Sequence, residues 1–308
     1  MSHCLLLLMV AAAACSGTTR HGVDGFGIDG FLGNGTDPDL SNPAYDFAGQ
    51  GNQQGCAGQA NGCYAVYAHS DHVLYYIDLS MKTLVTVGPF NAPLVPSGTK
   101  MVEDTITDLA VAPDGTIYVV SKSQLYRADA TTGHVTAVGP VALCGADNIA
   151  LSFTPDGSLY VADHKGAFCK IDLGTNPPAV SQIGTIGNGM ALSGDIVTIA
   201  DGTMYGTAYK LSDNASSGTQ INNLLVKIDP TTGASTQVIG STGFPKLFGA
   251  AYALGQVFGF THDGSGAVVT IDPKTGAGTA FNTFNDPATG KGIAFAGAGV
   301  NSLVPAIP

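Results

Sequence analysis

One short acidic pattern recurs five times along this chain and constrains its fold more than any other feature. In each copy one or two apolar residues precede an aspartate, and a second short apolar run follows. A period in the forties built from short β-rich runs is typical of a β-propeller with one four-stranded blade per repeat. The sequence therefore predicts an all-β fold made of a single propeller. The repeated aspartates, spaced 51, 43, 57 and 43 residues apart, are Asp78, Asp129, Asp172, Asp229 and Asp272.

The turns within the repeat support this prediction. Pro113-Asp114-Gly115 lies between two apolar runs, which is a strong hairpin signal because glycine accepts a positive φ. In turns such as 229–233 and 272–276, Asp can accept backbone N–H groups while Pro presets φ. We therefore assign the repeated aspartates a structural role rather than a catalytic one. In the second repeat we expect strands at 108–112, 116–120, 124–128 and 135–138.

The two ends of the folded region complement each other. Residues 63–88 supply only three strands, and residues 291–296 read as one isolated innermost strand. If this C-terminal strand joins the N-terminal blade, the ring closes and no sheet edge stays exposed to aggregation. This arrangement predicts five blades. The alternative is six, with the sixth formed by poorly patterned terminal residues.

The N-terminus has the features of an export signal. Leu5 to Ala14 is an apolar stretch that is too short to span a bilayer and ends in small residues. The segment from Ala12 to Cys15 resembles a bacterial lipoprotein box, which predicts lipidation of Cys15 at the mature N-terminus. We therefore expect an extracytoplasmic lipoprotein of a bacterial cell envelope, with ordinary secretion as the alternative. The predicted divisions are a signal at 1–15, a flexible Gly- and Asp-rich tether at 16–62 and the propeller at 63–308.

The remaining cysteines are even in number, which in an oxidising compartment indicates disulfides. The short loop between Cys56 and Cys63 favours a bond between those two, which leaves Cys144 to pair with Cys169. A zinc site is the rival interpretation, but the chain has no Cys-x-x-Cys spacing to support it.

Charge and motifs exclude several classes of function. The net charge of −11, with only 12 Lys and Arg residues, does not provide the clustered basic surface that nucleic acids require. The chain contains no Gly-x-Ser-x-Gly elbow, no His-Glu-x-x-His motif and no phosphate-binding Gly-Lys-Ser/Thr loop. The sequence therefore favours a binding protein over an enzyme.

Two long connections are expected on one face of the propeller. The segments Pro89 to Thr105 and Tyr209 to Asn223 depart from the regular period, and long loops on a rigid scaffold often carry binding sites. Polar residues fall on the same face. The candidate ligand-binding residues are Glu103, His69, His72, His164 and His262. The candidate ligands for Ca²⁺ or another divalent metal are Asp104, Asp147, Asn148 and Asp195.

The repeated pattern of apolar residue, Pro-Asp-Gly, Tyr-Val and then Ile-Asp-Pro-x-Thr-Gly resembles the secreted bacterial β-propeller repeat proteins. These include NHL-repeat and gluconolactonase-like proteins, and the resemblance covers residues 63–296. In gluconolactonase-like enzymes an Asn at the start of such a strand binds a central divalent metal, and the resemblance implies this role for Asn148. The family's other metal ligands have no counterpart here.

Three functions are compatible with these observations. The favoured one is a lipid-anchored scaffold that binds a protein or glycan and touches the membrane only through its N-terminal lipid. The second is a metal-dependent hydrolase, such as a lactonase, or a lyase with its site over the central channel. The third is a structural surface protein. The fold class alone does not decide among them, because propellers support many functions.

Overall fold

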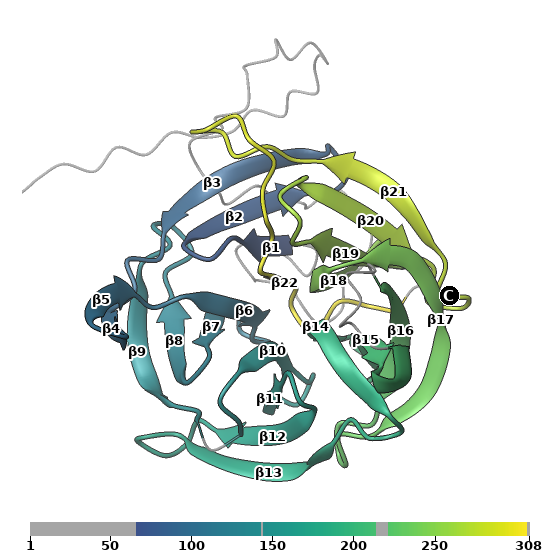
Figure 1. The fold of residues 1–308 in the computed structure, drawn as a ribbon, viewed down its shortest axis with the longest axis horizontal. Coiled ribbons are helices and arrows are strands. Elements are labelled where there is room, and N and C mark those ends of the chain that lie inside the picture. Colours follow the sequence, from purple (N-terminus) through teal and green to yellow (C-terminus); the bar gives the residue numbers. More distant parts are fainter. Residues whose placement is uncertain (1–65, 143, 214–220, 307–308) are drawn as a thin grey trace, which may run out of the picture. The chain divides into compact units, whose positions relative to one another are not determined.

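The computed structural model describes residues 66–142, 144–213 and 221–306, which form five four-stranded antiparallel sheets arranged as a ring (Figure 1). The predicted signal and tether, with Cys15, Cys56 and Cys63, lie outside the described residues. We number the blades along the chain and letter their strands A to D from the channel outward. Blade 1 consists of β22 (Gly297–Gly299), β1 (Val66–His69), β2 (Val73–Asp78) and β3 (Thr83–Pro89), and blade 2 of β6 (Ile106–Val111), β7 (Ile117–Ser121), β8 (Gln124–Ala128) and β9 (Val135–Pro140).

The other three blades follow in chain order. Blade 3 consists of β10 (Asn148–Phe153), β11 (Leu159–Asp163), β12 (Ala167–Asp172) and β13 (Ala179–Thr185), and blade 4 of β14 (Met190–Thr198), β15 (Met204–Lys210), β16 (Asn222–Ile228) and β17 (Ser235–Pro245). Blade 5 consists of β18 (Leu247–Ala253), β19 (Gln256–Thr261), β20 (Ala267–Ile271) and β21 (Gly278–Thr283). The fold prediction of one all-β, five-bladed propeller is confirmed.

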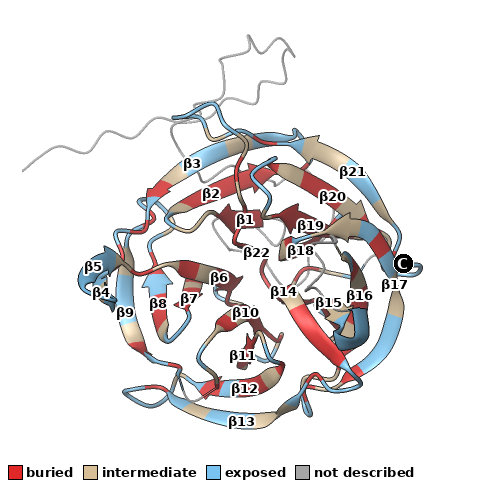
Figure 2. Cartoon of the chain, in the orientation of Figure 1, coloured by how far each residue is buried: buried red, intermediate tan, exposed pale blue. Residues whose placement is uncertain are grey.

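The core lies between neighbouring blades. Strands A and B are buried almost throughout, as in β6 and β11, because each is covered by the blades on both sides (Figure 2). The outermost strands β3 and β13 are half exposed, so their sequences alternate with polar residues. This gradient explains why the innermost strands read as continuous apolar runs in the sequence.

The repeated aspartates cap the turns between strands C and D. Asp129 Oδ1 accepts the backbone N–H groups of Thr131 and Thr132 at 2.9 and 2.8 Å. Asp229 accepts the N–H of Thr231 at 2.8 Å in the same way. The N–H groups hold the pKa of Asp129 below the usual range, and the Thr231 hydroxyl together with its N–H does the same for Asp229. The predicted structural role of these residues is confirmed.

The ring closes as predicted, but through different residues. The innermost strand of blade 1 is β22, Gly297–Gly299, which pairs antiparallel with β1. The predicted strand at 291–296 is wrong in its position: within it only Gly292 forms an isolated bridge, to Asn285. That segment instead runs inward between blades, where the N–H groups of Phe295 and Ala296 bond to the carbonyl oxygens of Thr261 and His69.

The C-terminal residues beyond β22 close one mouth of the channel. Asn301 Nδ2 donates to the carbonyl oxygens of Ala112 and Pro113 in the A–B turn of blade 2. Ser302 Oγ donates to the carbonyl of Thr154 in blade 3, and the carbonyl of Val304 accepts the N–H of Ala200 in blade 4. The channel is therefore blocked on the A–B face and opens only on the opposite face.

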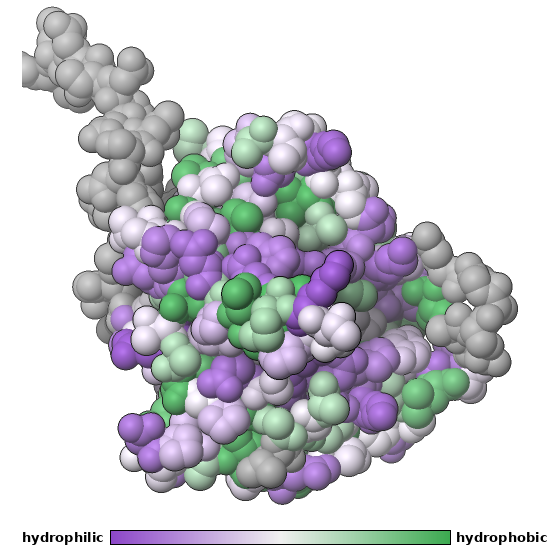
Figure 3. Space-filling view, turned by 60° about the vertical axis from the view of Figure 1, so that its left-hand side comes forward, coloured by the Kyte–Doolittle hydropathy of each residue, from purple (hydrophilic) through white to green (hydrophobic). Residues whose placement is uncertain are grey.

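One hairpin projects from the outside of the ring. Strands β4 (Leu94–Ser97) and β5 (Lys100–Glu103) form it, and its apolar residues Leu94 and Met101 are largely exposed. The side of the ring that carries this hairpin comes forward in Figure 3, where apolar and polar residues are interspersed. Among the residues described here, the one helical element is the short 3₁₀ turn Leu211–Asp213, and no helix is long and apolar enough to cross a membrane.

Removing residues 297–308 should destabilise the whole ring. The deletion takes away β22 and the C-terminal plug, so β1 is left with an unpaired edge facing the channel. We expect the melting temperature, followed by circular dichroism, to fall by roughly 10 °C or more. Deleting only residues 305–308 is the control and should leave it unchanged. An equal melting temperature for the two truncated chains would contradict this role of β22.

Candidate functional site: the pocket at the channel mouth

A pocket of about 760 Å³ opens on the face of the ring where the B–C and D–A connections emerge. Residues from all five blades line it, which places it on the axis of the ring. Thr105 at the end of one long connection lines this pocket together with Tyr209 and Asn223 at the ends of the other. The ends of both long connections therefore lie on the same face, while residues 214–220 lie outside the described part of the chain.

Five of the lining residues occupy one equivalent position. Strand B of each blade has an apolar residue paired with the residue before the repeated aspartate, as in Val66 with Ile77 and Ile117 with Ala128. Five positions further along the chain, every blade places a residue in the pocket. We call these the rim residues: Asp71, Lys122, His164, Tyr209 and His262.

The innermost strands provide the floor of the pocket through β-bulges. The register of strand A shifts around Thr107, Ile149 and Phe248, and over a longer bulge in β14 that contains Gly194. A bulge turns one side chain out of the regular alternation, here toward the open mouth. The floor residues, one from each blade, are Ala296, Thr107, Ile149, Gly194 and Phe248.

The next residue of each innermost strand forms a layer inside the channel, which we call the channel layer. It consists of Gly297, Asp108, Ala150, Asp195 and Gly249. Both aspartates are fully buried and bind backbone N–H groups of the following blade. Asp108 Oδ2 accepts the N–H of Leu151 at 2.6 Å, and Asp195 Oδ2 accepts that of Ala250 at 2.7 Å.

Burial raises the pKa of both carboxyls well above the usual range, and the charge of Asp195 raises that of Asp108 further. Because two neighbouring buried carboxylates cannot both ionise at low cost, the pair retains a proton to a pH well above that of an ordinary Asp.

A buried histidine faces this pair. His69 Nδ1 lies 2.8 Å from the carbonyl of Ser70, which can only accept, so Nδ1 carries the proton and Nε2 an acceptor lone pair. Burial lowers the pKa of His69 to about 4. Neither His69 Nε2 nor Asp108 Oδ1 has a partner within the described part of the chain, and a Cβ at Gly297 would collide with both. His69 Nε2 and Asp108 Oδ1 therefore both border the small space that the glycine at 297 leaves open.

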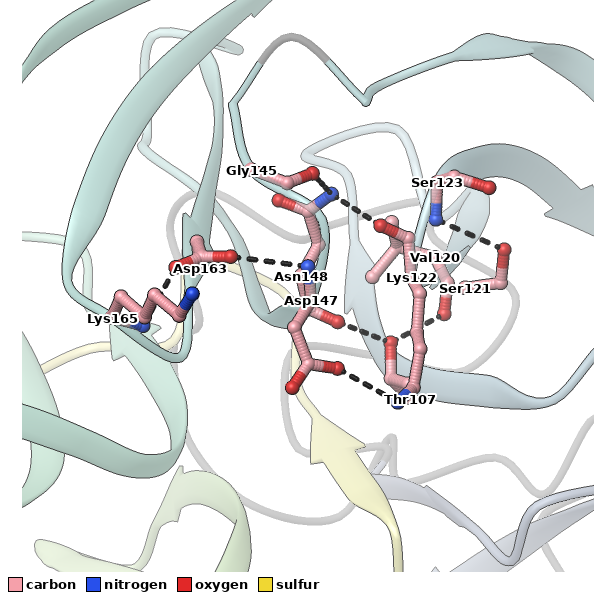
Figure 4. A network of polar contacts seen from close by, with 10 residues as sticks. All are labelled: Thr107, Val120, Ser121, Lys122, Ser123, Gly145, Asp147, Asn148, Asp163 and Lys165. Carbon is pink, nitrogen blue, oxygen red and sulfur yellow. Dashed lines mark hydrogen bonds and ion pairs between the residues drawn. The ribbon is translucent and has the colours of Figure 1, made fainter.

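The predicted residues Asp147 and Asn148 lie at the entry to β10, where they take part in local contacts (Figure 4). Asp147 lines the pocket and pairs with Lys122 Nζ at 3.0 Å. Asn148 Nδ2 donates to the carbonyl of Lys122 at 2.7 Å, which ties blade 3 to blade 2. Asp195 belongs to the channel layer below them.

The other candidates are distributed around the same face. His164 and His262 are rim residues, whereas His69 is buried beneath the floor. Asp104 accepts the Tyr126 hydroxyl at 2.7 Å, and Glu103 lies 3.8 Å from His72 near the hairpin. Across 66–142, 144–213 and 221–306, no three His, Cys, Asp or Glu side chains are grouped so as to hold a metal ion. The predicted metal ligands do not assemble into one donor set.

The predicted disulfide between Cys144 and Cys169 is present and joins the entry of blade 3 to its strand C. The pocket and channel residues that sequence reasoning missed include Lys122, Phe248 and Asp108. Lys122 could have been found by counting from the repeated aspartates, because it shares a position with His164 and His262. Asp108 carried no such signal, since it reads as the polar start of an apolar strand.

The comparisons with known proteins agree with a repeat architecture. Residues 144–292, a little under half of the chain, match a family described as a repeat of unknown function (DUF6923). No curated protein sequence matches the chain. This is a propeller repeat protein.

Similar solved structures are distant. One is a chain of a nidogen/laminin complex, with 13% identity and a TM-score of 0.47 over 78% of this chain and 98% of that one. Another is the PQQ-bound aldose sugar dehydrogenase of Streptomyces coelicolor, with 18% identity and a TM-score of 0.40 over 57% and 61%. These similarities are too remote to carry a functional conclusion.

The raised pKa of Asp108 predicts an unusual pH dependence of stability. Because the native state holds a proton that the unfolded chain releases near pH 3.8, this group makes the free energy of unfolding fall as pH rises through the raised value. Asp108→Asn should reduce that fall, since an amide can accept the N–H of Leu151 without ionising, and the part that comes from Asp195 should remain. Denaturant unfolding at a series of pH values measures this.

Asp129→Asn is the matched control. Its carboxyl has a lowered pKa, so it contributes stability above the unfolded pKa that is lost as pH falls. The control should therefore weaken the protein at neutral pH and flatten the acidic side of the profile. If the free energy of unfolding of Asp108→Asn instead fell with rising pH as much as that of the parent protein, Asp108 would not be a titrating group.

Proposed function

We propose that this chain is a lipid-anchored extracytoplasmic propeller that binds a protein or glycan ligand in the channel-mouth pocket. The observation that carries the proposal is the contrast between equivalent positions. In all five blades the strand-B residue that pairs with the residue before the repeated aspartate is apolar. The rim residues, five positions further along, include acidic, basic and aromatic side chains. A repeated backbone that varies its side chains at the pocket is what a binding site requires.

The closed A–B face supports the same conclusion. Because Asn301 and Val304 block the far mouth, the pocket is a blind cavity rather than a pore. Its walls combine apolar groups such as Ile149 and Phe248 with a few polar ones, the usual composition of a ligand site.

The hydrogen bonds that the polar residues already make within the protein favour binding over metal-dependent hydrolysis. Asp104 and Asn148, two of the four metal candidates, use their side chains to fix the D–A connections. Asp195 is engaged with backbone N–H groups inside the channel. The extracytoplasmic location is supported by the Cys144–Cys169 disulfide and by the signal-like N-terminal sequence.

Substituting two rim residues should weaken binding without unfolding the protein. We expect Asp71→Ala combined with His262→Ala to weaken binding to any partner found on glycan or peptide arrays by about tenfold or more. Met81→Ala with Leu254→Ala is the control, because both residues are exposed on the opposite face. If the control pair weakened binding as much as the rim pair, the ligand would not use this pocket.

Cys15 is expected to carry the lipid. Intact-mass measurement of the protein from bacterial membranes should show a chain that starts at Cys15 with added acyl groups, and Cys15→Ser should release the protein from the membrane fraction. A mature chain that retains Met1, or one cleaved elsewhere, would contradict the anchoring part of the proposal.

A further inference from the structure

On one side of the pocket the polar side chains are bonded to other protein groups, and on the other side they keep free donors and acceptors. We call the second side the uncommitted half. On the side of blades 2 and 3, Lys122 is paired with Asp147 at 3.0 Å. Thr107 Oγ1 lies 2.8 Å from the carbonyl of Asn148. A ligand on this side would have to break bonds that the protein already makes, which costs free energy.

The side formed by blades 4, 5 and 1 is different. Ser193 Oγ is buried without a partner among the described residues, and the side chains of Asp71 and Lys246 make no hydrogen bond or ion pair with the described part of the chain. Asn223 uses Oδ1 to accept the N–H of Leu247 at 2.7 Å, which leaves its amide N–H groups as donors.

His262 adds an acceptor to this half. Its Nδ1 lies 3.0 Å from the carbonyl of Phe295 and therefore donates, so Nε2 keeps its lone pair. The uncommitted half thus offers both acceptors and donors. A partner that satisfies all of them must itself present donors and acceptors close together, as hydroxyl groups do.

The same half contains a flat apolar surface. Phe248 and His262 both line the pocket and stack at 4.6 Å between ring centroids with an interplanar angle of 8°. The equivalent floor residue in blade 3 is Ile149, which has no flat face. An aromatic face beside mixed hydrogen-bonding groups suits a ring whose faces are C–H groups and whose edge carries hydroxyls.

Charge balance selects against a strongly charged ligand. The pocket is lined by two lysines, Lys122 and Lys246, and two aspartates, Asp71 and Asp147, so its formal charges cancel. An ion buried here would lose its hydration without a net opposite charge to replace it. A neutral polar ligand loses much less.

We propose that the half of the pocket formed by blades 4, 5 and 1 is a binding subsite for a neutral saccharide unit. The C–H face of one pyranose ring lies on Phe248, and its hydroxyls bond to Asp71, Asn223 and His262. The proposal rests on the proposed function, since it names the ligand class of the same pocket. The cavity of about 760 Å³ has room for a short oligosaccharide.

Calorimetric titration of the full chain with neutral oligosaccharides tests this. The probes are tetrasaccharides of β-1,4-glucose, α-1,4-glucose, β-1,4-N-acetylglucosamine and β-1,4-mannose. We expect at least one to bind, and Phe248→Ala to weaken it by about tenfold or more. Ile149→Ala, a truncation at the equivalent floor position of blade 3, should change the affinity by less than about twofold.

Phe248→Leu separates stacking from folding. It keeps an apolar side chain in the floor, so the melting temperature should stay within about 2 °C of the parent while the affinity falls as in Phe248→Ala. Equal losses from Ile149→Ala and Phe248→Ala would overturn the assignment to one half of the pocket. Full retention of affinity in Phe248→Leu would overturn the stacking role.

The outcomes also separate this proposal from the one it rests on. If none of the four saccharides binds, the saccharide assignment is overturned. Peptide binding that is lost in the Asp71→Ala, His262→Ala variant would then retain the pocket as a protein-binding site. If neither saccharides nor peptides bind in a pocket-dependent way, both proposals fall.

Discussion

The innermost strands of a propeller converge on the channel with one edge unpaired, and their N–H groups need acceptors there. Asp108 and Asp195 supply these acceptors from blades 2 and 4 to blades 3 and 5. Each side chain therefore joins two neighbouring blades inside the channel. Because a carboxyl that keeps its proton is neutral, the pair can be buried at a far lower cost than two charges. The pocket above it depends on this contact.

The small residues of the channel layer follow from the same constraint. A Cβ at Gly297 would collide with Asp108 and His69, and one at Gly249 would approach the backbone at Ala298 closely. Room for two carboxyl groups exists only because the other blades contribute glycine or alanine. This also explains why the closing strand is Gly297–Gly299 rather than the more apolar segment before it, since bulkier side chains at β22 would displace Asp108.

The sequence was sufficient for the parts of the fold that repeat. The aspartate turns, the strands between them and the Cys144–Cys169 bond follow from local patterns, whereas the closing strand was expected at 291–296 and lies at Gly297–Gly299. The site was only half predictable. His164 and His262 were predicted because histidine is a common ligand-binding residue. Lys122 and Tyr209 occupy the same position in the repeat with other side-chain chemistry. Position in the repeat, rather than residue type, selects the pocket-lining residues.

The insertion in blade 4 shows how the scaffold tolerates change around the pocket. At two regular seams, the carbonyl of a rim residue accepts the N–H of the next blade, as Asp71 does for Ile106. In blade 4 the long connection lies between the end of β15 at Lys210 and the start of β16 at Asn222. There the side-chain oxygen of Asn223 accepts the N–H of Leu247 instead. A single amide thus replaces the missing backbone acceptor and keeps the seam closed.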